Sequence, residues 1–268
     1  MARYEIPNLE SGYYLASGSV NGFVCFKGDV SSNRDSCPIS VYNPTTRQMV
    51  KLPDVTPNGR RIYVRLGYDP VEDQYKVLCV MSFSSKKAKY NQLEEHLVCT
   101  VSSSQKQEWR KIENTTGENY YYSCVYGGIC IDGALYYGVG KPRIAKFNVR
   151  SEKIEFIKTP KESLISTTLD SSFINYNGKL GGVDYCSWEE HPMTLWVLED
   201  AEKQEWSRMT YTIPSTWRRS FLKFKGVIHT GELMVFYPWL KLSQPFSVGY
   251  YDFNKKKYKK SRDPRIDE

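Results

Sequence analysis

Apolar and polar residues alternate along much of this chain with the two-residue period of half-buried β-strands. The stretch 173–209 shows the pattern most clearly, because it contains four such runs separated by turns. The runs are Phe173–Tyr176, Lys179–Val183, Thr194–Leu198 and Glu205–Met209. Asn177-Gly178 joins the first two and favours a two-residue hairpin, since both residues tolerate positive φ. The stretch therefore predicts one sheet of four consecutive antiparallel strands.

Four further copies of this pair of hairpins are present, and in chain order the stretch 173–209 is the fourth of the five repeats. The first repeat has expected strands at Ser17–Val20, Phe23–Phe26, Ile39–Tyr42 and Met49–Pro53. The second has them at Arg65–Tyr68, Tyr75–Val80, His96–Val101 and Glu108–Ile112. The third has them at Gly128–Ile131, Ala134–Tyr137, Ile144–Phe147 and Lys153–Ile157. The fifth has them at Gly226–His229, Glu232–Phe236, Phe246–Tyr251 and Tyr258–Lys260.

A repeat of about 45–60 residues with no helical period is typical of the four-stranded blades of a propeller. We therefore expect an all-β fold, a β-propeller of five four-stranded antiparallel blades. Six blades are the alternative if the two chain ends combine, and a β-sandwich is the competing architecture. We assign the propeller to residues 17–262, with 1–16 as an N-terminal segment that could add a closing strand and 263–268 as a tail.

Composition fits a globular β domain. The 268 residues include 21 Tyr, 11 Phe and 6 Trp, residue types that favour strands and fill the space between sheets. No apolar run approaches the length of a membrane span, and the first residues contain no apolar signal-peptide core. We expect a cytoplasmic or nuclear protein without a membrane partner.

The seven cysteines do not form a metal-binding pattern. No CxxC pair occurs, and Cys25 and Cys79 occupy apolar strand positions. Without a secretory signal they are expected to be reduced thiols of the core. The sequence therefore predicts neither a metal site nor a cofactor.

The net charge of +7 comes largely from two lysine clusters, 86–89 and 255–260. The second spans the last charged turn and the last strand, where lysine protects an exposed sheet edge. No basic stripe recurs across the repeats, so nucleic acid is not an expected partner.

Strand direction predicts where a partner would bind. The first and third connections of each repeat are tight, whereas the second connections and the crossovers are long. In an antiparallel unit these two groups lie at opposite ends, and variable loops on a rigid scaffold are frequent recognition sites. Trp, Tyr, Arg and Lys in the long connections are the candidate partner-binding residues. They are Tyr121, Trp188, Trp217, Arg218, Arg219, Trp239, Lys86 and Lys87.

An enzyme is not expected. Most acids occur in turn contexts, and Asp184 is the one carboxylate with a strand setting, where we expect a structural hydrogen-bonding role. His96, His191 and His229 have no nucleophile-elbow context nearby, and no phosphate-binding glycine loop occurs. Because a five-bladed propeller can carry paired carboxylates for glycoside hydrolysis, a glycan-binding or glycoside-hydrolase-like propeller is the alternative reading.

Several short segments follow one another in a recognisable order. They are Gly18–Cys25, Val41–Arg47 with Leu52-Pro53, Leu66–Pro70 with Tyr75–Val77, Gln107–Arg110, Gly128–Tyr136 and Ile174–Leu180. In this order they resemble the F-box-associated β-propeller domain of plant F-box proteins, most closely the type numbered three.

The resemblance implies a protein-interaction domain that recruits target proteins, as does the substrate receptor of a Skp1–cullin–F-box ubiquitin ligase. Nothing before Ser17 resembles an F-box, so a Skp1-like adaptor is an expected partner only if an F-box is supplied upstream. The sequence does not name the target protein.

Overall fold

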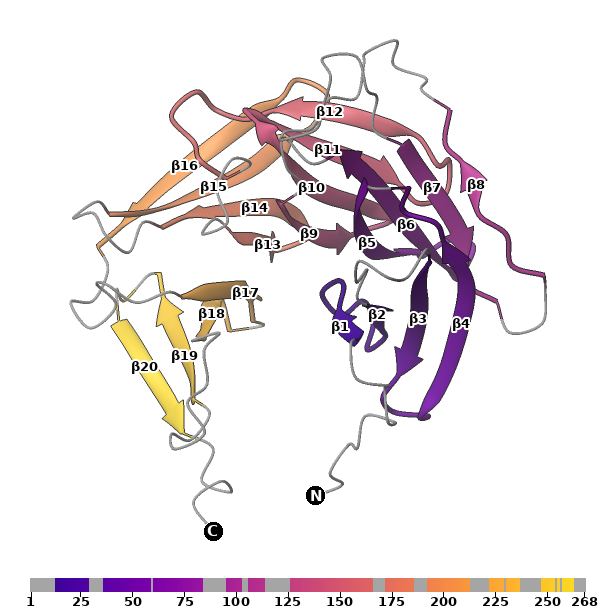
Figure 1. Cartoon of the computed structure of the whole chain (residues 1–268). Helices are drawn as coiled ribbons and strands as arrows, with labels where there is room; N and C mark the ends of the chain where they lie inside the picture. The colour runs from indigo at the N-terminus through magenta and orange to yellow at the C-terminus, as the bar shows by residue number, and fades with distance from the viewer. Residues whose placement is uncertain are drawn as a thin grey trace. The chain divides into compact units, whose positions relative to one another are not determined.

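A computed structural model describes most of the chain as antiparallel β-structure. The described residues are 13–28, 36–58, 60–83, 95–102, 106–113, 126–165, 172–185, 192–212, 222–228, 230–236, 247–253, 255 and 257–262. They contain five four-stranded sheets and no helix (Figure 1). Each sheet uses four strands that follow one another in the chain, and each strand is antiparallel to its neighbour.

The strand bounds are as follows. The first sheet contains β1 (Tyr13–Leu15), β2 (Val24–Gly28), β3 (Cys37–Asn43) and β4 (Gln48–Val55). The second contains β5 (Arg60–Asp69), β6 (Gln74–Phe83), β7 (Glu95–Thr100) and β8 (Arg110–Lys111). The third contains β9 (Tyr126–Ile131), β10 (Ala134–Lys141), β11 (Arg143–Asn148) and β12 (Ile154–Lys158). The fourth contains β13 (Ser172–Tyr176), β14 (Lys179–Asp184), β15 (Met193–Asp200) and β16 (Glu205–Tyr211). The fifth contains β17 (Lys223–Val227), β18 (Glu232–Phe236), β19 (Ser247–Asp252) and β20 (Lys257–Arg262).

The first strand differs from the sequence-based expectation. β1 lies at Tyr13–Leu15 and pairs with β2, whereas the predicted strand Ser17–Val20 makes only the isolated bridge from Val20 to Phe23. Tyr and Leu favour extended backbone more than the Ser-Gly-Ser run before Val20 does, so strand propensity and pairing with β2 account for β1, whose Tyr14 and Leu15 side chains are exposed. The N-terminal segment thus supplies an edge strand of the first sheet, and the described residues contain no sixth sheet.

The two-residue turns have the backbone that the sequence predicts. In Asn21-Gly22, Asp132-Gly133 and Asn177-Gly178 both residues have positive φ, as a type I′ hairpin requires. Asn and Asp adopt this region at low cost, and Gly adopts it freely.

The longer charged turns share a second design. Each begins with an Asn or Asp whose side-chain oxygen accepts a hydrogen bond from a backbone N–H two or three residues later, and a residue of positive φ ends each of the first four. The starting residues are Asn43, Asp69, Asn148, Asp200 and Asp252. The positive-φ residues are Arg47, Asp73, Glu152 and Gln204. In these Asx turns, side-chain hydrogen bonds hold the backbone conformation of the hairpin, and the positive-φ residue is not glycine.

The chain divides into two compact units. Unit 1 comprises Met1–Tyr136 and Ala145–Phe156, and unit 2 comprises Tyr137–Ile144 and Ile157–Glu268. The division passes through the third sheet, which supplies residues to both.

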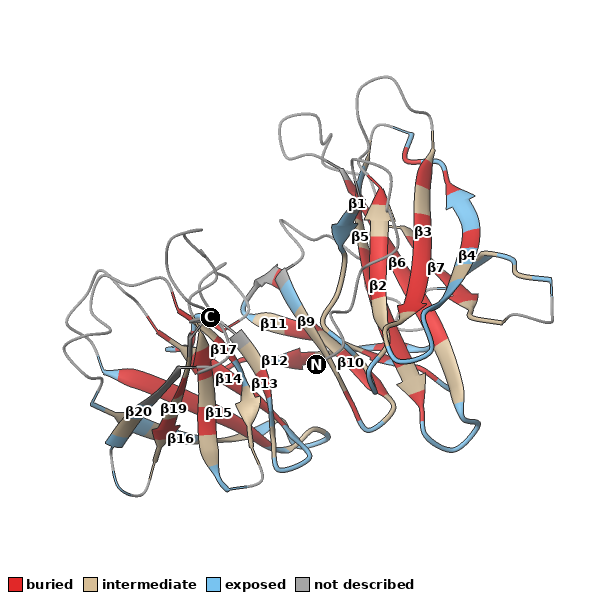
Figure 2. Ribbon diagram, turned by 90° about the horizontal axis from the view of Figure 1, so that it is seen from below, coloured by how far each residue is buried: buried red, intermediate tan, exposed pale blue. Residues whose placement is uncertain are grey.

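The core of unit 1 lies between the first and second sheets. Among the described residues, the buried side chains of this core include Ile39 and Val41 of β3 and Val64 and Leu66 of β5. Figure 2 shows β3 buried over most of its length. Alternate residues of β5 face this core, because the ladder between β5 and β6 runs without a bulge from Arg60↔Phe83 to Asp69↔Gln74.

The core of unit 2 lies between the fourth and fifth sheets. Ile174, Leu195 and Val197 of the fourth sheet pack with Leu233 and Tyr251 of the fifth. The hydroxyl of Tyr251 donates to the backbone oxygen of Thr212 at 3.1 Å. Aromatic rings thus fill this space while their polar atoms find partners.

Gly67 gives a test of the packing in unit 1. A Cβ at this position would lie 2.8 Å from Val149 Cγ2 and 3.0 Å from Leu135 Cδ1, both from the third sheet. Gly67→Ala should therefore lower the free energy of unfolding by about 1–3 kcal/mol, since the neighbouring side chains must move. The measurement is urea-induced unfolding followed by circular dichroism.

Gly18→Ala is the matched control, because nothing lies within 4 Å of its Cβ position. Its free energy of unfolding should be unchanged or raised by up to about 1 kcal/mol. Equal destabilisation by both substitutions would contradict the close approach at Gly67.

Candidate partner-binding site

The eight candidate residues from the sequence, Tyr121, Trp188, Trp217, Arg218, Arg219, Trp239, Lys86 and Lys87, lie outside the described residues. The described strands nevertheless fix where their segments attach. Segment 84–94 joins β6 to β7, 186–191 joins β14 to β15, and 237–246 joins β18 to β19. Each is the second connection of its sheet. In an antiparallel sheet it therefore attaches at the end opposite to the Asx turns, here called the loop end.

The crossovers attach at the same end of their sheets. Segment 114–125 follows β8, and segment 213–221 follows β16, each the fourth strand of its sheet. Within each sheet, the strand order thus separates the tight turns from the segments that contain the candidate residues. The eight assignments themselves stay predictions.

A charged cluster occupies the loop end of the second sheet. Glu95 begins β7 and accepts from Arg60 of β5, and Lys111 Nζ of β8 lies 3.3 Å from Glu95 Oε1. Burial alone would raise the pKa of Glu95, but the hydrogen bonds from Arg60 and Lys111 outweigh it and lower that pKa. Glu95 is therefore a carboxylate at neutral pH, and two cations surround it.

The face of the second sheet that turns away from the apolar core is polar, and we call it the polar face. The ladders place Arg61, Tyr63, Arg65, Gly67, Asp69, Lys76, Leu78, Val80, Ser82, His96, Val98, Thr100 and Arg110 on it. Arg65, Asp69, Lys76, Ser82 and His96 are all buried. Burying a polar group costs free energy of folding unless the group forms hydrogen bonds or ion pairs, so the stability of this face depends on specific polar partners.

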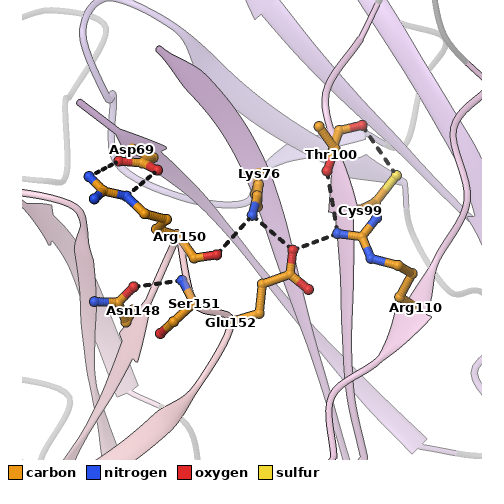
Figure 3. Close-up of polar contacts among 9 residues, drawn as sticks. All are labelled: Asp69, Lys76, Cys99, Thr100, Arg110, Asn148, Arg150, Ser151 and Glu152. Atoms are coloured by element: carbon orange, nitrogen blue, oxygen red, sulfur yellow. Dashed lines mark hydrogen bonds and ion pairs between the residues drawn. The ribbon is translucent and has the colours of Figure 1, made fainter. Parts of the chain in front are cut away.

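The third sheet supplies the partners at the Asx-turn end (Figure 3). Arg150 donates two hydrogen bonds to Asp69, Nε to Oδ2 and Nη2 to Oδ1, both at 3.0 Å. Glu152 lies between Lys76 and Arg110, and Lys76 Nζ is 2.8 Å from Glu152 Oε1. The turn 148–152 thus ties the third sheet to the second with charge-assisted hydrogen bonds.

These contacts set the charge states. The hydrogen bonds from Arg150 lower the pKa of Asp69 to about 2. Burial raises the pKa of Glu152, but the hydrogen bonds from Lys76 and Arg110 prevail and lower it. Both groups are ionised at neutral pH, so neither is suited to donate a proton in catalysis.

The opposite face of the second sheet carries thiols. Cys79 and Cys99 join Cys25 and Cys37 of the first sheet in the core of unit 1. Burial raises the pKa of the Cys25 thiol to about 12 and that of Cys99 to about 11. Such thiols are poor nucleophiles. Among the described residues, no three His, Cys, Asp or Glu side chains are grouped to hold a metal ion.

Asp184 has the structural role expected from the sequence. Its Oδ2 accepts from Trp196 Nε1 at 2.8 Å and from the backbone N–H of Leu164 at 3.1 Å. Arg208 lies 5.3 Å from the centre of the Trp196 ring and pairs with Glu162 at 2.9 Å. Asp184 therefore connects the segment after β12 to the fourth sheet through hydrogen bonds.

Two indole contacts were not foreseen from the sequence. Trp109 Nε1 donates to the backbone oxygen of Pro53 in β4 at 2.7 Å, and Trp206 Nε1 donates to that of Lys158 in β12 at 3.0 Å. Each tryptophan follows Gln-Glu and lies next to or within the fourth strand of its sheet. The repeated Gln-Glu-Trp motif, which contributed to the family resemblance, thus joins that strand to the fourth strand of the preceding sheet.

Within the described ranges, no helix is long and apolar enough to cross a bilayer.

One protein family matches nearly the whole chain. The family described as "F-box associated beta propeller domain" matches residues 2–266. Similar proteins of Arabidopsis thaliana include F-box protein At1g30790, 37% identical over 96% of this chain, and Putative F-box protein At3g23960, 34% identical over 90%. The chain covers 66% and 62% of the length of these two relatives.

Solved structures with a similar backbone are more distant. The beta-propeller domain of the trilobed protease from Pyrococcus furiosus has a TM-score of 0.48 and 13% identity, with 90% of this chain and 70% of that chain covered. TolB from Acinetobacter baumannii has a TM-score of 0.45 and 12% identity, with 91% and 52% covered.

His96 gives a pH test of the polar face. Burial lowers the pKa of His96 to about 3, well below the ordinary 6.5. The unfolded chain therefore binds a proton that the folded chain excludes, and stability is lost as the pH falls from about 6.5 toward 3. Between pH 7 and pH 5 the wild type should lose about 2 kcal/mol more than His96→Gln. Urea unfolding at several pH values measures the two slopes, and equal slopes would contradict a buried neutral His96.

Proposed function

The chain belongs to the F-box associated beta propeller domain family, and on this premise we propose that it is a non-catalytic domain that holds target proteins for a ubiquitin ligase. The five four-stranded sheets are the blades of the predicted β-propeller. The family match over residues 2–266 is the observation that carries the proposal, because its relatives are named F-box proteins. Such proteins recruit targets to Skp1–cullin ligases.

The geometry of the described residues supports a binding role. Asx turns and type I′ turns hold one end of each sheet in fixed conformations, while the segments that contain the candidate residues attach at the loop end. A rigid scaffold with variable segments at one end is a common arrangement for protein recognition. Target binding through Trp217, Arg218, Arg219 and Trp239 is part of the proposal.

The proposal assigns no catalytic residue. Asp69 and Glu152 are held as carboxylates by neighbouring cations, and Asp184 fastens a chain segment. A glycan-binding or hydrolytic propeller gains no support from these contacts.

Ligase docking is a second part of the proposal. The chain spans 66% and 62% of the length of two relatives. An adaptor of the Skp1 type is a partner only if an F-box is joined to this domain. A cytoplasmic or nuclear location is proposed with it, since ubiquitin ligases of this type act there.

The capture of a target tests the binding role. The chain, immobilised and crosslinked in an Arabidopsis thaliana extract, should retain a specific protein that mass spectrometry identifies. With that protein purified, the double substitution Trp217→Ala and Trp239→Ala should weaken affinity by about thirtyfold or more, as expected for loss of binding hot spots. Isothermal titration calorimetry measures the affinity.

Val71→Ala is the matched control. Val71 is an apolar residue of the β5–β6 turn, 71% exposed, at the end of the second sheet opposite to the loop end. Its substitution should leave the affinity unchanged. If the control weakens binding as much as the tryptophan pair, the assignment of binding to the long connections is wrong.

A further inference from the structure

The fourth strand of each sheet has one edge that faces away from the third strand, and we call it the outer edge. About every second residue of such an edge directs its backbone N–H and C=O groups away from the sheet, so an uncovered edge can pair with a strand of another chain. Proteins usually prevent this pairing with short strands, proline, lysine or a covering contact. The five outer edges of this chain differ in these protections.

Four of the five fourth strands, as the structure describes them, have a protection of this kind. β4 contains Pro53, whose carbonyl accepts from Trp109 Nε1 at 2.7 Å, and β8 is only two residues long. In β12 the backbone N–H of Lys158 donates to Gln204 Oε1 at 3.2 Å, and its carbonyl accepts from Trp206 Nε1 at 3.0 Å. β20 contains three lysines. Each of these edges is therefore a poor template for another strand.

β16, the last strand of the fourth sheet, has none of these protections (Figure 1). Its seven residues, Glu205–Tyr211, include neither proline nor lysine. Its ladder with β15 is regular over the six consecutive pairs that end at Met193↔Tyr211. In the part of the chain that the structure describes, the backbone of β16 hydrogen-bonds to β15 alone. The outer edge of β16 is therefore a regular strand edge whose backbone groups have no protein partner there.

The alternate side chains of β16 determine what an added strand would meet. Ser207, Met209 and Tyr211 lie on the face toward the core of unit 2, and Met209 and Tyr211 pack against that core while they stay partly exposed. The hydroxyl of Tyr211 donates to Met209 Sδ at 3.3 Å. A strand beside β16 would place every second side chain next to these two residues, where an apolar residue is favoured.

We propose that an extended segment of the target protein pairs with the outer edge of β16 as a fifth strand of the fourth sheet, with apolar side chains beside Met209 and Tyr211. This inference rests on the proposed function and specifies how the target is held. In strand addition, main-chain hydrogen bonds supply affinity and alternate side chains supply specificity. β16 also leads into segment 213–221, which contains Trp217 and is already proposed to bind the target.

A target segment fits this edge better than a second copy of the chain does. The net charge is +7, so two copies repel each other. An edge of seven residues alone is also too small to bury the roughly 1,200 Å² of a stable dimer interface. A short extended segment needs no more than the length of one strand.

The first experiment uses a fluorescent, uncharged octapeptide of alternating Val and Gln, so that the net charge of the chain does not contribute. Fluorescence anisotropy should show saturable binding with a dissociation constant below about 1 mM. Two further peptides carry N-methyl groups on every Val or on every Gln, and each lacks the backbone donors of one edge only. One of them should lose binding and the other should keep it, because only one edge of an added strand faces β16.

Hydrogen–deuterium exchange followed by mass spectrometry locates the bound peptide. Excess peptide should slow exchange at the amides of residues 205–211. It should leave residues 257–262 of β20 unchanged, because the lysines of that strand oppose pairing. No saturable binding, equal binding of both N-methyl peptides, or slowed exchange at β20 without any at β16 would overturn the proposal.

Thr210→Lys tests the edge from the protein side. Thr210 is exposed, so the variant should keep the thermal unfolding midpoint of the wild type while it places a lysine on the edge, as in β20. Peptide affinity should fall about fivefold or more, whereas Thr210→Val should keep it. Thr45→Lys is the matched control, because Thr45 is exposed in the β3–β4 turn and gains the same charge. Equal weakening by the two lysine variants would contradict the assignment to β16.

The oligomeric state and the captured target separate the remaining outcomes. If analytical ultracentrifugation shows a dimer that Thr210→Lys dissociates, a second copy occupies the edge and the proposal is wrong. If the wild type binds a captured target without slower exchange at residues 205–211, the edge is not its site, while the binding role stands. If the wild type retains no target, the binding role fails, and the peptide titration alone then decides whether β16 accepts a strand.

Discussion

Each sheet of this chain is four strands wide, and an apolar face of such a sheet must pack against another sheet to be removed from water. In unit 1 the second sheet packs against a neighbouring sheet on both of its faces. One face closes on the first sheet through aliphatic side chains and thiols, and the other meets the third sheet through ion pairs and a close approach at Gly67. Hydrophobic burial supplies most of the favourable free energy on the first side. Hydrogen-bond geometry fixes the register on the second.

The sequence carried enough information for the repeat, the turns and most of the strands. Hairpin signals such as Asn177-Gly178 are local, since two residues must reach positive φ wherever the strands lie. Alternation of apolar residues is also local, which is why predicted strands such as Glu232–Phe236 agree with the structure. The first strand was wrong because a weak run of Ser and Gly was preferred over Tyr13–Leu15, where the tyrosine and leucine side chains favour a strand.

The site was less accessible to sequence reasoning, because its features are contacts between sheets. Arg65 in β5 and Gly128 in β9 are far apart in the chain, and no local sequence pattern in either strand predicts that the two residues lie in contact. Alternation assigns Arg61 and Ile62 to opposite faces, but it does not say which neighbouring sheet each face will meet. The pairing of Asp69 with Arg150 likewise joins turns of two different repeats.

The two Gln-Glu-Trp tryptophans make each unit observable by itself. Trp109 reports on the seam between the first and second sheets of unit 1, and Trp206 reports on a seam within unit 2. Each indole N–H donates to a backbone carbonyl of the neighbouring sheet, so deuterium replaces its hydrogen more slowly while that hydrogen bond is intact. Nuclear magnetic resonance of these two indole signals would therefore measure hydrogen exchange separately at one contact between sheets in unit 1 and one in unit 2.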